Sequence, residues 1–233
     1  MKKKVVSVII PAYNEAKYIS ETLKNLKFNW IKEIIVVDDG SIDGTYLKAK
    51  KHNNISLFHF SKNRGKGEAV TYGLSKATGE VILLLDADLG KSVIEAKKLV
   101  IPIFNNETQV TIGVLPITGG GIGAVRRSAD LALKIITGTK MKAPLSGQRA
   151  FKRGVIKDLI PFAAGFGLEI GMDIDIIAKN YNYKEVFCNF KHNVTGHSSA
   201  GYRHRFKQLC DILKTSMIKG YQLRDLEKIY SKK

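Results

Sequence analysis

Cysteine is scarce in this chain of 233 residues. Cys188 and Cys210 lie far apart without CxxC spacing, so neither a disulfide framework nor a zinc knuckle is indicated. Long apolar runs are also missing, and no segment approaches the roughly 20 apolar residues that a membrane span requires. The basic start Met1–Lys4 is typical of a signal peptide, but Ser7 and Pro11 interrupt the apolar stretch after it and no small-residue cleavage site follows. We therefore expect a cytoplasmic protein.

Acidic residues are few beside the basic ones. The 38 Lys and Arg outnumber the 21 Asp and Glu, which gives a formal net charge of +17. Such an excess favours an anionic partner, namely a phosphorylated small molecule, a nucleic acid or a membrane surface. With only 5 Pro and 44% hydrophobic residues, the composition is that of an ordinary globular protein. The length predicts a single domain, residues 1–233, or one domain with an appendage, because two independent domains would each be cramped.

Short runs rich in β-branched residues or leucine predict buried strands in the first half of the chain. They are Val5–Ile10, Ile34–Asp38, Ile55–Phe60, Val81–Asp86 and Val110–Val114. Their nearly continuous apolar character is typical of parallel strands covered on both faces. Segments with helical periodicity alternate with these runs, and such repeats indicate an open α/β sheet.

The sequence pattern changes in the second half of the chain. The glycine-rich residues 119–123 predict a mobile loop, because they lack both the ending of a P-loop and the spacing of a dinucleotide-binding fingerprint. We expect helices over Ala124–Ile136, from Gly167 onward and over the basic stretch Tyr202–Lys233, and a strand over Val186–Phe190.

Polar clusters follow the first, second and fourth predicted strands. Their sequences are Pro11-Ala12-Tyr13-Asn14-Glu15, Asp38-Asp39-Gly40-Ser41 and Asp86-Ala87-Asp88. Asp, Asn and Gly are common wherever a strand ends in a turn. However, ligands of open α/β sheets gather at the carboxyl ends of the strands, and three such clusters together favour a binding site.

The cluster at Asp86 and Asp88 follows the most apolar strand and could bind a divalent cation. Mg²⁺ and Mn²⁺ prefer one or two carboxylates and fill the remaining positions with water and substrate phosphates. The alternative for Asp88 is a cap for the helix that follows. Lys66 adds a glycine-flanked cation just before a helix whose amides can meet an anion, although the same lysine could be merely solvated. Together they indicate a metal and diphosphate site.

These motifs, in this order, resemble those of family 2 glycosyltransferases. The resemblance rests on Val8–Glu15, Val36–Thr45, Asn63–Gly67 and the DxD motif Asp86–Asp88. It implies the GT-A fold, an α/β fold with a Rossmann-like, mostly parallel central sheet flanked by helices and followed by C-terminal helices. It also implies a nucleotide-sugar-binding half at residues 1–115, an acceptor-binding half at 116–200 and a basic helical tail at 201–233.

The resemblance also assigns roles to individual residues. Asp88 is expected to contribute to catalysis by binding the metal that neutralises the diphosphate. Nucleotide-sugar contacts are implied for Pro11, Ala12, Tyr13, Glu15, Asp38, Asp39, Lys66, Asp86 and Ala87.

The segments Pro144–Arg153 and Gly165–Ile170 are similar to polyprenyl-phosphate sugar synthases and glucosyl-3-phosphoglycerate synthase-like enzymes. This similarity implies a catalytic Glu169, for which the alternative is an acid that stabilises a helix N-terminus. Acceptor contacts are expected from Ser146, Gly147, Arg149 and Arg203, and His192 is the candidate for a further metal ligand.

The sequence therefore predicts a Mn²⁺- or Mg²⁺-dependent glycosyltransferase. It would move a sugar from a nucleoside diphosphate sugar, with UDP-glucose favoured, to a small anionic acceptor. The alternative is a polyprenyl-phosphate sugar synthase that contacts the inner membrane face. The sequence is also compatible with a homodimer. A nucleic-acid-binding module leaves the acidic strand ends unexplained, since carboxylates repel a phosphate backbone.

Overall fold

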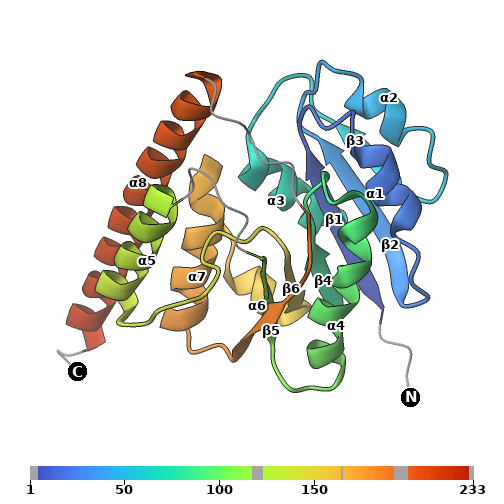
Figure 1. The fold of residues 1–233 in the computed structure, drawn as a ribbon. Coiled ribbons are helices and arrows are strands. Elements are labelled where there is room, and N and C mark those ends of the chain that lie inside the picture. The colour runs from blue at the N-terminus through green and yellow to red at the C-terminus, as the bar shows by residue number, and fades with distance from the viewer. Residues whose placement is uncertain (1–4, 117–122, 164, 192–198, 231–233) are drawn as a thin grey trace.

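The computed structural model of the chain describes residues 5–116, 123–163, 165–191 and 199–230 (Figure 1). Within these residues a sheet of seven strands runs through the centre, in the order β3-β2-β1-β4-β6-β5-β7. The strands are β1 Val6–Ala12, β2 Ile31–Asp38, β3 Ser56–His59, β4 Val81–Leu84, β5 Val110–Val114, β6 Arg149–Lys152 and β7 Tyr183–Phe187.

Most neighbouring strands are parallel. Strand β1 pairs with β2 and β4, β2 with β3, and β5 with β7, all in parallel. Strand β6 runs antiparallel to both β4 and β5. Because β6 is reversed, its first residues lie at the edge of the sheet where β4 and β5 end.

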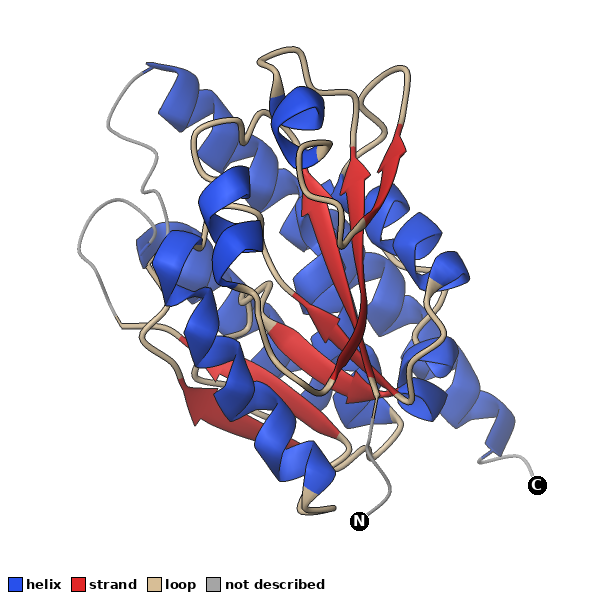
Figure 2. Ribbon diagram, turned by 90° about the vertical axis from the view of Figure 1, so that its right-hand side faces the viewer, coloured by secondary structure: helices blue, strands red, loops and turns tan. Residues whose placement is uncertain are grey.

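Helices cover both faces of the sheet (Figures 1 and 2). On one face lie α1 Ile19–Asn25, α2 Thr45–Ala49, the 3-10 helix η1 Gly90–Ala96 and α4 Lys97–Phe104. On the other lie α3 Lys66–Lys76, α6 Arg153–Asp158 and α7 Leu168–Ala178, which follows the 3-10 turn η2 Gly165–Gly167. Helices α5 Gly123–Thr137 and α8 Ser199–Tyr230 pack against α7 and against each other.

The apolar runs produce this layering. In β1, Ile9 faces the layer of α3 and α7, whereas Val8 and Ile10 face the layer of α1 and α4, and all three are fully buried. A strand alternates its side chains between two faces, so a continuous apolar run is required where both faces are covered.

The predicted α/β sheet is confirmed, with two corrections. Strand β6 was not expected, and β7 begins three residues before the predicted Val186–Phe190 strand, at Tyr183. The helices expected over Ala124–Ile136 and Tyr202–Lys233 correspond to α5 and α8. Residues 119–122 of the predicted glycine-rich loop lie outside the described residues. No helix in the described part of the chain is long and apolar enough to cross a membrane.

Candidate active site

A small pocket at the carboxyl edge of the parallel strands brings together segments from both halves of the chain. It is lined by Pro11, Lys66, Val70, Leu84, Leu85, Asp86, Gly147, Leu168, Glu169 and Met172. Five of these residues are predicted site residues, and they come from β1, α3, the end of β4, the start of β6 and α7. The topology therefore collects them at the place where ligands bind in open α/β sheets.

The ammonium group of Lys66 lies between two carboxylates. Lys66 Nζ donates to Asp86 Oδ1 and to Glu169 Oε1, each at 2.8 Å. The side chain of Lys66 is 32% exposed, that of Asp86 26% and that of Glu169 9%. Burial alone would lower the pKa of Lys66, but Asp86 and Glu169 raise that pKa above its ordinary value. Lys66 is therefore held as a cation at the centre of the pocket.

The turn after β4 is held by two side chains from other elements. Gln148 Nε2 donates to Asp86 Oδ2 at 2.5 Å, and Gln148 is 1% exposed. On the other side, the hydroxyl of Thr22 in α1 donates to the carbonyl of Ala87 and accepts from the N–H of Gly90, both at 2.8 Å. The acidic turn therefore has little freedom to change its shape.

Gly147 leaves the space that the Lys66–Asp86 pair occupies. A Cβ atom at Gly147 would lie 2.7 Å from Lys66 Nζ and 2.9 Å from both carboxylate oxygens of Asp86. At such distances the ends of the Lys66 and Asp86 side chains would have to move away from their present positions. Glycine at position 147, just before β6, therefore leaves room for the Lys66–Asp86 ion pair.

The loops after β1 and β2 are tied to each other. The N–H of Asn14 donates to Ser41 Oγ at 2.9 Å, and the N–H of Ile42 donates back to Asn14 Oδ1 at 3.0 Å. A third bond runs from the N–H of Glu15 to Thr45 Oγ1 at 2.8 Å. Because these bonds join the two loops, we expect the loops to move together at this edge of the pocket.

Asp38 is part of the same loop structure. Its side chain is fully buried, its Oδ1 accepts the hydroxyl of Ser41, and its Oδ2 lies 2.7 Å from His59 Nδ1. These contacts give Asp38 a role in shaping the loop after β2. Direct contact between Asp38 and a nucleotide stays a prediction.

Asp39 fixes the turn that leads into α3. Its two carboxylate oxygens accept the N–H groups of Arg64 at 2.7 Å and Gly65 at 2.8 Å. Burial raises the pKa of Asp39, while these two hydrogen bonds oppose the rise. Gly65 has a φ of 97°, which favours glycine. The turn in this way places Lys66 at the first position of α3.

The sequence matches a known family over most of its length. A sequence model described as Glycosyl transferase family 2 matches residues 7–170. The chain belongs to this family. One relative, UDP-N-acetylglucosamine–dolichyl-phosphate N-acetylglucosaminyltransferase of Methanococcus voltae, is 31% identical over 185 residues, which are 68% of this chain and 74% of that protein. Glucosyl-3-phosphoglycerate synthase of Mycobacterium tuberculosis is 30% identical over 198 residues, which are 74% of this chain and 60% of that protein.

A crystal structure of the mycobacterial synthase has the same fold. In its complex with UDP it matches this chain with a TM-score of 0.76 and 25% identity, over 91% of this chain and 80% of that one. The same synthase has been crystallised with Mg²⁺ and UDP, and with Mn²⁺, UDP-glucose and phosphoglyceric acid. The chain is thus a family 2 glycosyltransferase of GT-A-like architecture, as the motifs predicted.

One predicted acceptor residue occupies an unexpected place in this family 2 enzyme. Arg149 is fully buried, and its guanidinium bonds Asp173 of α7 through Nη1–Oδ1 at 2.5 Å and Nη2–Oδ2 at 3.1 Å. Its Nε also donates to the carbonyl of Ser146 at 2.7 Å. We therefore correct the expected role of Arg149, because a guanidinium enclosed in this way is not presented to an acceptor.

Burial has a large effect on Asp173. It raises the pKa of Asp173 to about 7, although the bound guanidinium of Arg149 opposes the rise. The pair connects β6 to α7, one helical turn below Glu169. Arg149 and Asp173 therefore support the site from beneath.

The remaining predicted residues lie around the pocket with different degrees of access. Tyr13 is 46% exposed, Asp88 is half-buried, and Ala12, Ala87 and Ser146 are buried. His192 and the side chain of Arg203 lie outside the described residues. Their predicted contacts with metal and acceptor stay predictions.

The family implies a divalent metal ion, and the side chains near the end of β4 can be examined as its ligands. The described residues contain no group of three or more His, Cys, Asp or Glu side chains arranged to hold a metal ion. Asp86 and Asp88 nevertheless offer two carboxylates at the end of β4. Mg²⁺ and Mn²⁺ commonly use only one or two protein carboxylates when a substrate supplies phosphate oxygens, so the donor set fits such an ion.

Two contributors to the site were missed in the sequence. Thr22 lies within a helical stretch where a buried threonine carries no distinctive pattern. Gln148 directly follows Ser146 and Gly147, for which acceptor contacts are expected, and its bond to Asp86 spans 62 positions of the chain. That contact forms because β6 pairs with β4. A prediction of β6 as a strand would therefore have placed Gln148 at the site.

Proposed function

We propose that the chain transfers a sugar from a UDP-sugar, with UDP-glucose the favoured donor, to an acceptor that carries phosphate or carboxylate. The observation that carries the proposal is the placement of Lys66 between Asp86 and Glu169 at 2.8 Å from each. This arrangement joins a cation suited to a diphosphate with an acid suited to the reacting sugar or the acceptor.

Lys66 is placed to bind the diphosphate. A lysine ammonium has three donors, and among the described residues Asp86 and Glu169 take two of them. One donor is left for a phosphate oxygen. Lys66 is also the first residue of α3, where helix amides and the helix dipole favour an anion. The leaving diphosphate gains charge as its bond to the sugar breaks, and fixed positive charge stabilises that change.

Asp88, with Asp86 beside it, would hold Mg²⁺ or Mn²⁺ against the same diphosphate. When bound, the ion would neutralise part of the diphosphate charge. Gln148 and Thr22 keep the turn that carries these carboxylates in place. The mycobacterial synthase crystallised with either ion supports this assignment.

Glu169 is the candidate for contact with the acceptor or the transferred sugar. It lies in the first turn of α7 and is 7% exposed, with its Oε1 on Lys66. A carboxylate here can accept a hydrogen bond or a proton from an attacking hydroxyl group. Because Asp173 and Arg149 brace α7 one turn below, the position of Glu169 is well defined.

The acceptor's charge is inferred from the basic residues of the second half. Arg127, Lys140 and Lys142 are exposed there, while Arg149 is excluded by its burial. Exposed cations attract phosphate or carboxylate over about 8–10 Å at physiological salt.

A donor and acceptor panel tests the proposal. Nucleotide release would be measured for UDP- and GDP-sugars with Mn²⁺, using phosphorylated, carboxylated, polyprenyl-phosphate and neutral acceptors. We expect release to require a UDP-sugar and an anionic acceptor, with an acceptor KM that rises with salt. Chelation of the metal, or Asp88→Asn, should remove most of the activity. Efficient use of a neutral acceptor, with a KM indifferent to salt, would contradict the proposal.

Replacing Lys66 with alanine should weaken UDP binding by about 1–3 kcal/mol, because a charge-assisted hydrogen bond to the diphosphate is lost. Isothermal titration calorimetry would measure the affinity. Lys76→Ala is the matched control, since Lys76 is exposed at the other end of the same helix. Equal UDP affinities for Lys66→Ala and the wild type would show that Lys66 serves only to neutralise its two carboxylates.

A further inference from the structure

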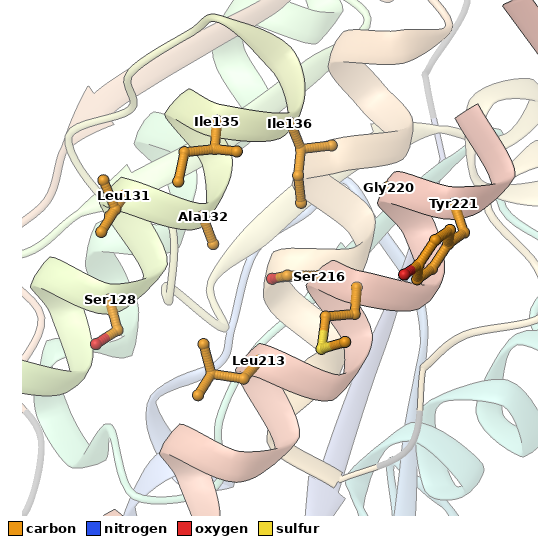
Figure 3. A pocket seen from close by; sticks show the side chains of 10 residues that line it. Ser128, Leu131, Ala132, Ile135, Ile136, Leu213, Ser216, Gly220 and Tyr221 are labelled. Atoms are coloured by element: carbon orange, nitrogen blue, oxygen red, sulfur yellow. The ribbon is translucent and has the colours of Figure 1, made fainter. Parts of the chain in front are cut away.

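A second, larger pocket lies away from the active site, between α5 and α8. It has a volume of about 320 Å³ and is an apolar groove (Figure 3). Leu131, Ile135 and Ile136 line it from α5, and Leu213, Met217 and Tyr221 line it from α8. Among the residues that the structure describes, no charged side chain lines this groove, so it lacks the chemistry of the Lys66 site.

The rims of this groove are apolar and exposed to solvent. Ile135 is 68% exposed, Met217 62% and Tyr221 64%. On each helix the exposed apolar residues recur at a spacing of four, as Leu131 and Ile135 do on α5. Residues at this spacing share one face of a helix. The two helices therefore present one continuous apolar face outward, and an apolar face of this kind marks an interaction site.

Basic residues adjoin the apolar face. Arg127 and Lys134 of α5 and Lys214 of α8 are exposed, and each is next in sequence to a residue that lines the groove. Of the acids on these two helices, Asp130 and Asp211 are only half-exposed. Asp211 also approaches Gly165, on the side of α8 that faces the body of the protein. The outward face thus combines apolar side chains with basic ones.

This combination distinguishes between two occupants. A second copy of the chain would bring like charges together, since each copy carries a formal net charge of +17. An anionic lipid surface accepts both properties at once, because it takes apolar side chains into its interfacial layer and attracts lysine and arginine. We propose that the face formed by α5 and α8 docks on an anionic membrane surface.

The docking face is connected to the active site through α7. Helix α8 packs closely on the turn before α7, where a Cβ atom at Gly167 would overlap the Thr215 hydroxyl. Glu169 follows two residues later, in the first turn of α7. Docking would therefore place the surface against a helix that contacts the turn leading to Glu169, and the role of Glu169 rests on the proposed function.

Vesicle sedimentation tests the docking itself. The whole protein would be mixed with vesicles of phosphatidylglycerol and phosphatidylcholine, and with vesicles of phosphatidylcholine alone. We expect binding to the anionic vesicles, at least tenfold weaker binding for Leu131→Gln with Met217→Gln, and roughly fivefold weaker binding for Lys214→Gln. The matched control is Leu47→Gln with Ile101→Gln, which changes two exposed apolar residues on α2 and α4 and should bind like the wild type.

The outcomes separate the alternatives. Failure of the wild type to sediment with anionic vesicles, or an equal loss in the control variant, would overturn the proposal. So would a dimer in sedimentation velocity that the Leu131 and Met217 changes dissociate, because the face would then be covered by a second copy. Sedimentation needs no turnover, so its result is independent of whether the proposed transfer reaction is correct.

Discussion

Replacing Glu169 with glutamine should lower kcat about a hundredfold or more while leaving the affinity for UDP nearly unchanged. Glutamine keeps an oxygen that can accept the bond from Lys66, but it loses the charge and basicity that an attacking hydroxyl or a developing positive sugar needs. Proton-transfer groups commonly contribute factors of this size. An effect confined to the transition state lowers kcat rather than donor binding.

The measurement is a comparison of kcat and donor Kd for Glu169→Gln and for Glu68→Gln. Glu68 also lies in the first turn of a helix, α3, but it is exposed. The control should retain full activity. If Glu169→Gln did so as well, Glu169 would serve only as an acid at a helix N-terminus.

Replacing Arg149 with alanine should destabilise the protein by about 3–5 kcal/mol, because it leaves the fully buried carboxylate of Asp173 without its partner. Urea unfolding would measure this loss. Combining Arg149→Met with Asp173→Leu should recover much of the stability, since apolar replacements of buried ion pairs are often tolerated. A loss below about 1 kcal/mol for Arg149→Ala would show that the pair does little to join β6 to α7.

The same variant should depend on pH in a defined direction. Arg149 is the group that lowers the pKa of Asp173, so its removal raises that pKa further above about 7. The folded state then binds more protons than the unfolded state, whose aspartates titrate near pH 4. Stability therefore falls as pH rises through this window. The deficit of Arg149→Ala should accordingly be smaller at pH 5 than at pH 8.

The parallel strands were readable from the sequence because burial on both faces demands continuous apolar runs. Strand β6 was not, since only Ala150 and Phe151 are apolar among its four residues. Strand β7 was placed too late, because Tyr183, Lys184 and Glu185 are polar or amphipathic and suit a strand at the edge of the sheet. These short strands are defined by their partners rather than by their own composition.

The candidate site, like the sheet, was predictable from the sequence only in part. Lys66 and Asp86 belong to motifs whose residues lie close together in the sequence, so each was recognised. Their meeting with Glu169 was not predictable from spacing, because 103 positions separate Lys66 from Glu169. The burial of Arg149 could not be inferred either, since an arginine is usually at the surface and only the position of Asp173 explains its place.

The register of β6 determines the contacts of two neighbouring polar side chains. Gln148 and Arg149 are adjacent, and one bonds Asp86 at the pocket while the other bonds Asp173 beneath α7. Adjacent residues of an extended chain point in opposite directions. A slip of β6 by a single residue would turn both side chains to the opposite face of the sheet, so Gln148 would lose Asp86 and Arg149 would lose its ion pair with Asp173. Correct alignment of this short strand is thus enforced by polar contacts on both sides, and an alternative pairing during folding would lose both of them at once.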